Sequence, residues 1–328
     1  MSAPIPPPGL GLGGAPLGNL FAPVSEANAG ATLAAAWEAG IRYFDTAPFY
    51  GFGLSEHRLG AFLRARSRAD FTLSTKVGRL LEPDPLRPAS EAGYVGGLPF
   101  RVRFDYSAAG TERSLADSLQ RLGLARLDIV FIHDPAEDTH GAAWRAMFDA
   151  AMAGAAKVLT ALRSQGVIGA WGLGVNRIEP CLLALEHASP DLFLLAGRYT
   201  LLDTSALDRL FPACAARGVR VVAGGPYNSG LLAGGSTFDY QAAPPALRER
   251  CEQIQACCRR FDVPMKAAAL QFPAAHPVVA AVIAGARNAA EVAENAAMMR
   301  VAIPARFWAA LAAEGVLPKT APLPAASS

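Results

Sequence analysis

The chain has 328 residues, of which 52% are hydrophobic and 18% are charged, and its formal net charge is +2. A chain this apolar can bury a large core, which excludes an intrinsically disordered protein. The nearly neutral charge, without blocks of Lys and Arg, argues against nucleic-acid binding.

The N-terminal residues, the apolar runs and the cysteines indicate the compartment. Residues 1–6 contain no basic region followed by a long apolar run, so no signal peptide is expected. The longest apolar run, Val278–Ala284, is far too short to cross a membrane, and no membrane partner is expected. The five cysteines lack the paired spacing of a disulfide framework or a zinc site. These features predict a cytoplasmic protein without a metal.

Short apolar runs alternate with longer helical patterns along the chain. The expected strands are Gly9–Gly14, Ile41–Asp45, Phe71–Lys76, Asp128–His133, Ile168–Val175, Leu192–Gly197, Val219–Gly224 and Val278–Ile283. The expected helices are Glu26–Ala39, Ser55–Arg64, Glu112–Leu122, Ala143–Gln165, Glu179–His187, Ser205–Arg217, Pro245–Phe261 and Ala289–Met299. Continuous apolar strands that alternate with helices are typical of a parallel sheet covered on both faces.

This alternation predicts an α/β fold, a closed (β/α)8 TIM barrel that forms a single domain over residues 1–328. A doubly wound open sheet is the structural alternative. An irregular, proline-containing stretch, residues 79–110, follows the third strand, and we expect it to form a long active-site loop over the C-terminal face of the barrel. Residues 321–328 are expected to form a flexible tail, which follows a stretch rich in Pro and Ala.

The N-terminal glycines have the spacing of a dinucleotide-binding motif. Gly9, Gly11 and Gly14 match G-x-G-x-x-G, but that motif requires a strand before it and a helix directly after it. Only a proline-rich start precedes Gly9, and residues 15–19 do not begin a helix. We therefore interpret these glycines as part of a crowded first strand and not as a Rossmann motif.

Four polar side chains are expected at the C-terminal face of the barrel, where this fold carries its active sites. Asp45, Lys76 and His133 end their strands, and Tyr50 follows the first of them. A tyrosine of ordinary pKa is a poor base at neutral pH, and lowering that pKa by about three units requires about 4 kcal/mol. A nearby ammonium supplies an energy of that order. We expect Asp45 to hold Lys76, and His133 to orient a substrate oxygen.

The sequence resembles the aldo-keto reductase superfamily over nearly its whole length. The resemblance rests on Phe44-Asp45-Thr46-Ala47, Tyr50-Gly51, Ser74-Thr75-Lys76, His133, Gly172-Leu173-Gly174-Val175-Asn176, Pro226, Gly230-Leu231-Leu232, Gly285-Ala286-Arg287 and Glu294-Asn295. In that family an Asp, Tyr, Lys and His tetrad is catalytic. The resemblance therefore implies that Asp45, Tyr50, Lys76 and His133 are the catalytic residues.

The same resemblance implies a nicotinamide cofactor, NAD or NADP, with Asn176 at its carboxamide. The other residues implied for the cofactor are Gly225, Pro226, Tyr227, Gly230, Leu231, Gly285, Arg287, Glu291 and Asn295. Val175, Ala196 and Gly224 stand where the family commonly has Ser, Gln and an aromatic residue that stacks on the nicotinamide. Glu291 stands where an Arg often binds the 2′-phosphate, so we expect NAD to be used at least as well as NADP.

Within the family, three segments are most similar to a dehydrogenase branch. They are His133-Asp134-Pro135, Leu195–Tyr199 and Gly224–Gly230. The branch includes D-threo-aldose 1-dehydrogenase (L-fucose dehydrogenase), L-galactose dehydrogenase and pyridoxal 4-dehydrogenase. This similarity implies a small-molecule substrate, a free aldose whose anomeric carbinol is oxidised to the lactone.

In this interpretation the Tyr50 phenolate is the general base and hydride passes to nicotinamide. Phe49 and Asp134 are expected to contact the substrate. Oxidation of pyridoxal hemiacetal to 4-pyridoxolactone is the alternative reaction. More remote alternatives are a cofactor-binding regulatory subunit of low turnover and an aldolase that uses Lys76 as a Schiff-base lysine. A monomer or a small homo-oligomer is expected.

Overall fold

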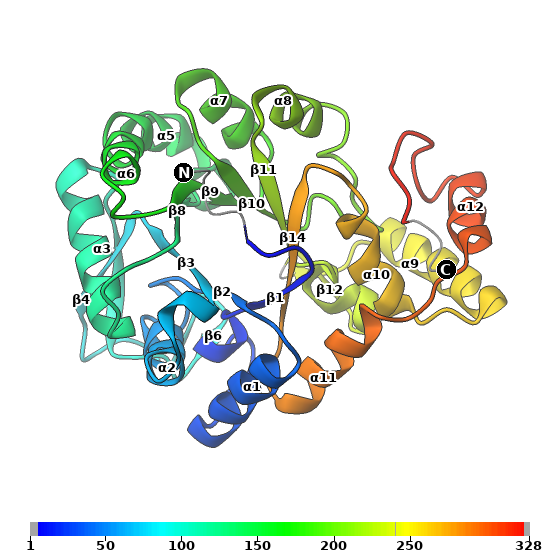
Figure 1. Ribbon diagram of the computed structural model, residues 1–328, viewed down its shortest axis with the longest axis horizontal. Helices are drawn as coiled ribbons and strands as arrows, with labels where there is room; N and C mark the ends of the chain where they lie inside the picture. Colours follow the sequence, from blue (N-terminus) through cyan, green and yellow to red (C-terminus); the bar gives the residue numbers. More distant parts are fainter. Residues whose placement is uncertain (1–5, 240, 325–328) are drawn as a thin grey trace.

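The computed structural model describes residues 6–239 and 241–324. Parallel strands form a closed eight-stranded barrel in the order β1-β14-β11-β10-β9-β8-β3-β2, and the pairing of β1 with β2 closes it (Figure 1). The barrel strands are β1 (Leu10–Gly13), β2 (Tyr43–Asp45), β3 (Thr72–Val77), β8 (Ile129–His133), β9 (Ala170–Val175), β10 (Leu192–Ala196), β11 (Arg220–Gly224) and β14 (Val279–Gly285). The predicted (β/α)8 barrel is confirmed, and each expected strand forms with small shifts of its ends.

The helices lie around the outside of the barrel (Figure 1). They are α1 (Glu26–Glu38), α2 (Leu54–Leu63), α3 (Ala108–Leu122), α4 (Glu137–His140), α5 (Trp144–Ala153), α6 (Ala155–Ser164), α7 (Glu179–His187), α8 (Leu210–Arg217), α9 (Pro245–Phe261), α10 (Met265–Ala274), α11 (Ala289–Met298) and α12 (Ala305–Ala313). Across residues 6–239 and 241–324, none of them combines the length and the apolar character needed to cross a membrane.

Buried side chains on both faces of the strands hold the barrel together. All five residues of β8 are buried, which explains its continuous apolar sequence. Phe131 packs with Tyr43, Leu194 and Ile283 in the cluster inside the barrel. Neighbouring residues such as Ile132 instead pack in the larger core between the strands and the helices. Burial of each large apolar side chain stabilises the fold by about 1.5–3 kcal/mol.

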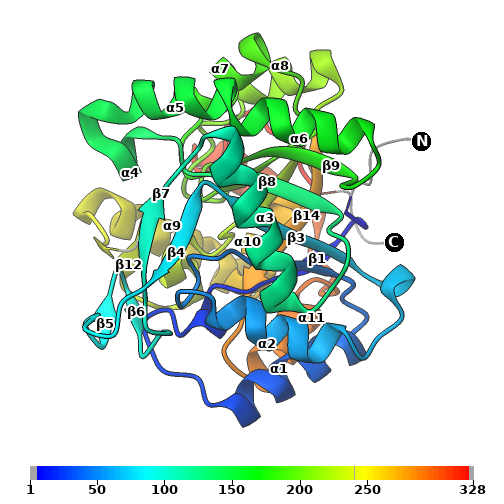
Figure 2. The same cartoon turned by 90° about the vertical axis from the view of Figure 1, so that its left-hand side faces the viewer.

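The segment after β3 differs from the expected irregular loop. It contains an antiparallel hairpin of β4 (Arg79–Pro83) and β7 (Phe100–Phe104), with Arg79 opposite Phe104. A smaller hairpin of β5 (Ser90–Glu91) and β6 (Tyr94–Val95) lies between them. Figure 2 shows these hairpins and β12 (Thr237–Phe238) together on the left of the molecule. The insertion is therefore an ordered wall, and its place after β3 agrees with the prediction.

One expected helix, over residues 143–165, is divided into α5 and α6 at Gly154. A Cβ atom at Gly154 would lie 2.4 Å from the carbonyl oxygen of Tyr106, so the chain passes too close for any side chain. The backbone there leaves the helical region, with φ −106° and ψ −82°. The break has a tertiary cause, which the helical pattern of the sequence could not reveal.

Two further helices depart from the predicted strict alternation. α10 follows α9 directly, before β14, and α12 lies in the Pro- and Ala-rich segment after residue 302, where no helix was predicted. In α12 the side chains of Phe307, Trp308 and Leu311 are buried against the core. Of the expected flexible tail, 321–328, residues 325–328 lie outside the described residues.

Candidate active site

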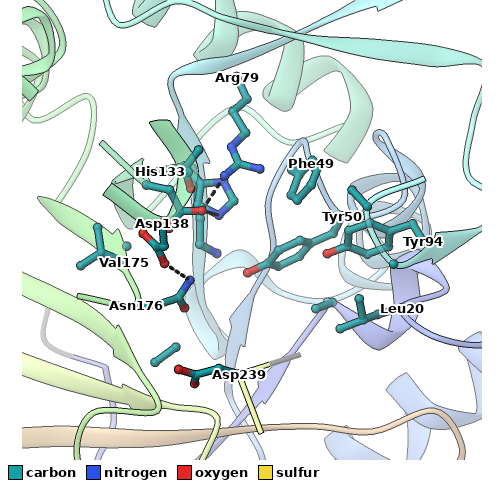
Figure 3. A pocket seen from close by; sticks show the side chains of 18 of the residues that line it. Leu20, Phe49, Tyr50, Arg79, Tyr94, His133, Asp138, Val175, Asn176 and Asp239 are labelled. Carbon is teal, nitrogen blue, oxygen red and sulfur yellow. Dashed lines mark hydrogen bonds and ion pairs between the residues drawn. The ribbon is translucent and has the colours of Figure 1, made fainter. Parts of the chain in front are cut away.

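A cavity of about 1040 Å³ opens at the C-terminal ends of the barrel strands (Figure 3). Its wall includes Phe49, Tyr50, Lys76, His133, Asp134 and Asn176. Three of the four predicted tetrad residues thus share one cavity, and the fourth, Asp45, lies directly behind Lys76. The hairpin of β4 and β7 forms another part of the wall through Arg79, Val102 and Phe104.

Lys76 and Asp45 form a buried ion pair at the bottom of the cavity. The ammonium Nζ of Lys76 donates hydrogen bonds to Oδ2 of Asp45 at 2.7 Å and to the carbonyl oxygen of Thr46 at 2.9 Å. The two side chains are only 2% and 4% exposed. Burial raises the pKa of Asp45, and the neighbouring ammonium of Lys76 opposes that rise. The ammonium is thus fixed in position with one donor still available toward the cavity.

A chain of hydroxyl groups orients the carboxylate of Asp45. Ser74 Oγ donates to Oδ1 of Asp45 at 2.7 Å and lies 3.0 Å from the hydroxyl of Tyr43. Because the single Ser74 hydrogen is directed to the carboxylate, the Tyr43 hydroxyl is the donor of the second bond. Asp45 therefore has each oxygen paired, Oδ1 with Ser74 and Oδ2 with Lys76, which prevents rotation of the carboxylate.

Tyr50 lies close to both the ammonium of Lys76 and the imidazole of His133. Lys76 Nζ is 4.6 Å from the centroid of the Tyr50 ring, within the range of a cation–π interaction. The rings of Tyr50 and His133 are 6.0 Å apart and nearly perpendicular. Figure 3 shows Tyr50 pointing into the cavity, toward the side where His133 and Asn176 lie. The phenol is partly exposed and can meet a substrate.

His133 is buried and held by its neighbours. The hydroxyl of Tyr106 donates to the backbone carbonyl of His133 at 2.7 Å. Nε2 lies 3.3 Å from Oδ2 of Asp134, and Nδ1 has no hydrogen-bond partner among the described residues. Burial lowers the pKa of His133 well below its usual value, and the charges of Arg79 and Lys76 lower it further. The imidazole is therefore neutral near pH 7 and can act as a hydrogen-bond donor.

The two predicted substrate residues, Phe49 and Asp134, also line the cavity. The guanidinium of Arg79 lies 4.1 Å from the centroid of the Phe49 ring and pairs with Asp134. Burial raises the pKa of Asp134 to about 6, against the lowering effect of Arg79. The sequence reasoning missed Arg79. The sequence did contain a signal for it, since Arg79 comes only three residues after Lys76, which was already assigned to the site.

The predicted carboxamide residue, Asn176, follows β9 and lines the cavity. Its side-chain Nδ2 donates to Asp138 at 3.2 Å (Figure 3), and its backbone carbonyl accepts from Nε of Arg198 at 2.7 Å. Arg198 is buried and also pairs with Asp203 and with Asp239, which lies between β12 and β13 (Gln241–Ala242). Arg198, another residue missed as a site residue, thus links the end of β9 to the hairpin over the cavity.

The other nine predicted cofactor residues lie outside the cavity wall, in two segments. One segment follows β11, and the other begins at Gly285, the last residue of β14. The hydroxyl of Tyr227 donates to Oδ1 of Asn295 at 2.6 Å, which joins the two segments. Glu291 accepts from the backbone N–H of Arg287 at 2.9 Å and from its guanidinium at 3.2 Å. Arg287 is therefore already paired with Glu291, the residue that stands where the family often has a phosphate-binding Arg.

This arrangement can transfer a proton to or from a substrate oxygen. A phenol next to a buried ammonium and a neutral imidazole supplies an acid or base and a hydrogen-bond donor. Within residues 6–239 and 241–324, no group of three or more His, Cys, Asp or Glu side chains is arranged to hold a metal ion. The phenol, the ammonium and the imidazole gathered in the cavity are groups that can perform acid–base chemistry at a carbonyl or carbinol.

Known proteins share this fold and sequence pattern. The aldo/keto reductase family matches residues 9–314. The chain is 42% identical to a pyridoxal 4-dehydrogenase of Microbacterium luteolum, over 94% of both chains. It is 41% identical to a D-threo-aldose 1-dehydrogenase of a Pseudomonas species, over 95% of both chains. An L-galactose dehydrogenase of Arabidopsis thaliana is 30% identical and matches 88% of this chain and 83% of its own.

Solved structures agree with this result. An aldo-keto reductase of Bacillus halodurans in its holo form superposes with a TM-score of 0.68 at 25% identity, over 94% of both chains. A glycerol dehydrogenase of Gluconobacter oxydans superposes with a TM-score of 0.70 at 21% identity, over 97% of this chain and 94% of its own, which shows the shared fold. The protein belongs to the aldo/keto reductase family and is an oxidoreductase.

Proposed function

We propose that the protein oxidises the anomeric carbinol of a free aldose of the L-fucose type to the lactone, with NAD or NADP as the oxidant. The observation that carries the proposal is the buried Lys76–Asp45 ion pair, whose ammonium lies 4.6 Å from the ring centroid of Tyr50. The 41% identity to a D-threo-aldose 1-dehydrogenase supports the same class of substrate.

In the proposed reaction Tyr50 is the general base. The positive charge of Lys76 stabilises the phenolate form of Tyr50 relative to the phenol, because charges interact strongly in a partly dry site. The phenolate oxygen takes the proton of the anomeric hydroxyl. The neutral imidazole of His133 donates a hydrogen bond to the same substrate oxygen and orients it. Formation of a lactone favours oxidation, since the product is an ester and not a reactive aldehyde.

The residues present fit a nicotinamide dinucleotide. The small side chains Gly174, Val175 and Ala196 line the cavity next to Asn176, which leaves space for a planar ring beside an amide that would hold the carboxamide. Oδ1 of Asn228 is buried without a hydrogen-bond partner among the described residues, as a ligand-binding acceptor would be. When bound, the cofactor would supply the acceptor for the hydride that leaves C1 of the sugar.

We further propose that NAD is used at least as well as NADP. The carboxylate of Glu291 receives both the backbone N–H and the guanidinium of Arg287. A 2′-phosphate at Arg287 would have to compete with this carboxylate and would be repelled by it. An NAD ribose carries no such charge. Arg287 remains able to bind phosphate, so NADP is not excluded as a cofactor and is only expected to be used no better than NAD.

Pyridoxal is the second candidate substrate. The 42% identity to a pyridoxal 4-dehydrogenase favours it, and so does the aromatic wall of the cavity. The ring of Tyr94 lies 5.3 Å from that of Phe49 and 6.3 Å from that of Tyr50. Such a wall would suit the flat ring of pyridoxal and the apolar face of a sugar alike. The same tetrad would serve either hemiacetal.

The test is an assay of NAD and NADP reduction against a panel of free aldoses, including L-fucose, and pyridoxal. The proposal predicts lactone formation from L-fucose or a related aldose, with a higher kcat/KM than for pyridoxal. It also predicts a kcat/KM with NAD that equals or exceeds that with NADP. A preference for pyridoxal over every aldose would reject the sugar assignment, and a strong preference for NADP would reject the cofactor assignment.

A further inference from the structure

The ion pair of Arg79 and Asp134 is built into the cavity wall beside His133. Nη2 of Arg79 lies 2.5 Å from Oδ2 of Asp134, and the two side chains are only 5% and 12% exposed. Both residues line the cavity. Asp134 has φ +49°, a left-handed conformation that costs a non-glycine residue about 1–3 kcal/mol. The protein thus keeps a strained residue and a buried charge at the position next to its imidazole.

The pair has hydrogen-bonding capacity that the protein itself does not use. Nε of Arg79 is buried and has no partner among the described residues. Among the same residues, Oδ1 of Asp134 makes no hydrogen bond, since only Oδ2 is engaged. The Phe49 and Phe104 rings, 4.1 and 5.3 Å from the Arg79 guanidinium, fix its plane.

The location of the pair identifies the part of the substrate that it would meet. Oδ2 of Asp134 is 3.3 Å from Nε2 of His133. In the proposed reaction His133 holds the oxygen of the carbinol that is oxidised. A group bound by Asp134 and Arg79 is therefore attached to the carbon next to that carbinol, which is C2 of an aldose.

We propose that Arg79 and Asp134 form a subsite for the hydroxyl on the carbon adjacent to the reacting carbinol. This inference rests on the proposed function. The hydroxyl accepts a hydrogen bond from the guanidinium of Arg79 and donates one to the carboxylate of Asp134. A hydroxyl is the group that both accepts and donates in this way.

The charges of the subsite favour a neutral substrate. The guanidinium and the carboxylate compensate each other, and Asp138 adds a further negative charge to the same wall. An ionic group would meet one partner of like charge and one of opposite charge, and would lose its own hydration without net compensation. A 2-hydroxyaldose satisfies both partners, whereas a 2-deoxyaldose leaves the buried pair without its ligand. The loss of hydrogen bonds to charged groups corresponds to a preference on the order of 100-fold.

The test compares kcat/KM for L-fucose and for 2-deoxy-L-fucose. The wild-type protein is expected to prefer L-fucose by on the order of 100-fold. Asp134→Asn and Arg79→Lys are expected to lower kcat/KM for L-fucose and to change that for 2-deoxy-L-fucose by less than a few-fold, so the preference collapses. Arg103→Lys is the matched control, because Arg103 lies on the same hairpin but pairs with Glu82 and Asp105 outside the cavity wall. The Arg103→Lys variant is expected to prefer L-fucose over 2-deoxy-L-fucose by the same factor as the wild type.

Several results would overturn the proposal. If the wild-type protein has equal kcat/KM for the two sugars, the proposal is overturned. This comparison needs no variant, so it holds even if both variants fail to fold. A parallel loss for both sugars in Asp134→Asn and Arg79→Lys would show a merely structural pair. If no aldose is oxidised at all, the proposed function fails together with the subsite, whereas oxidation of both sugars at equal efficiency overturns the subsite alone.

Discussion

The ammonium of Lys76 lies 4.6 Å from the centroid of the Tyr50 ring. Lys76 is buried, whereas Tyr50 is partly exposed to the cavity. The cation therefore contacts the phenol ring from within the protein interior. An ion in such a place acts on its neighbour more strongly than in water. The proposed ionisation of Tyr50 therefore depends on a charge that only folding can bring there.

Replacement of Lys76 tests the energetics of this arrangement. Lys76→Met leaves Asp45 as an uncompensated buried carboxyl, and we expect the free energy of unfolding to fall by about 3–5 kcal/mol. In the double variant Lys76→Met/Asp45→Asn the loss should be smaller than the sum of the two single losses, because the two groups interact directly. Urea denaturation of the four proteins measures this. Strict additivity would show that the pair contributes no coupling energy.

The pH dependence of activity should report Asp134. Burial raises the pKa of Asp134 to about 6, which Arg79 and Lys76 lower and Asp138 raises. Above about pH 6 the group is a carboxylate that pairs with Arg79, and below it the pair is lost. We therefore expect kcat/KM for an aldose to fall as the pH drops through about 6. In Asp134→Asn this inflection should disappear.

His133 should not contribute to the same inflection. Burial holds the pKa of His133 well below its usual value, so the imidazole stays neutral through this pH range. An inflection near pH 6 that persists unchanged in Asp134→Asn would argue that another group, and not Asp134, controls the profile.

The cofactor preference should respond to Glu291. Glu291→Gln removes a negative charge beside Arg287 and weakens the pairing of its guanidinium. We expect the ratio of kcat/KM with NADP to that with NAD to rise by about two- to fivefold, the effect of one exposed charge interaction. Glu179→Gln is the control, since Glu179 also lies in the first turn of a helix but belongs to α7. An unchanged ratio in Glu291→Gln would remove this residue from cofactor selection.

Gly172 is required by the close approach of β9 to β10. A Cβ atom at Gly172 would lie 1.6 Å from the carbonyl oxygen of Leu192, so the strands would have to separate. We expect Gly172→Ala to destabilise the protein by about 3 kcal/mol or more, at the upper end of overpacking effects. Gly30→Ala in α1 has open space and should stabilise the protein by about 0.5–1 kcal/mol. Thermal unfolding of both variants measures these changes in stability. A Gly172→Ala protein as stable as the wild type would contradict the prediction.

The sequence predicted those parts of the site that depend on strand order. Asp45 and His133 are the last residues of β2 and β8, and Lys76 is the last residue but one of β3. These three strands are neighbours in the barrel. Because parallel strands end at the same edge, recognising the strands was enough to bring the three side chains together. Tyr50 follows β2 closely and could not be far from them. The family resemblance pointed to the same residues.

The features that the sequence did not reveal depend on contacts between distant segments. The break at Gly154 comes from the chain at Tyr106, and an isolated glycine within a helical pattern carries no such information. The pairing of Arg79 with Asp134 requires the β4–β7 hairpin, which was expected to be irregular. The contact of Arg198 with Asp239 likewise joins two loops. Each of these contacts is a tertiary one without a local signature.

The central claim is that the Tyr50 hydroxyl transfers the proton, and turnover of the best substrate by Tyr50→Phe tests it most directly. We expect kcat to fall by about 10²–10⁴-fold, as loss of general acid–base catalysis implies, while the melting temperature and the affinity for the cofactor stay unchanged. Tyr199→Phe is the matched control, because the buried Tyr199 hydroxyl has no hydrogen-bond partner among the described residues, and it should retain full turnover. A Tyr50→Phe protein that turns over within a few-fold of the wild type would contradict the account.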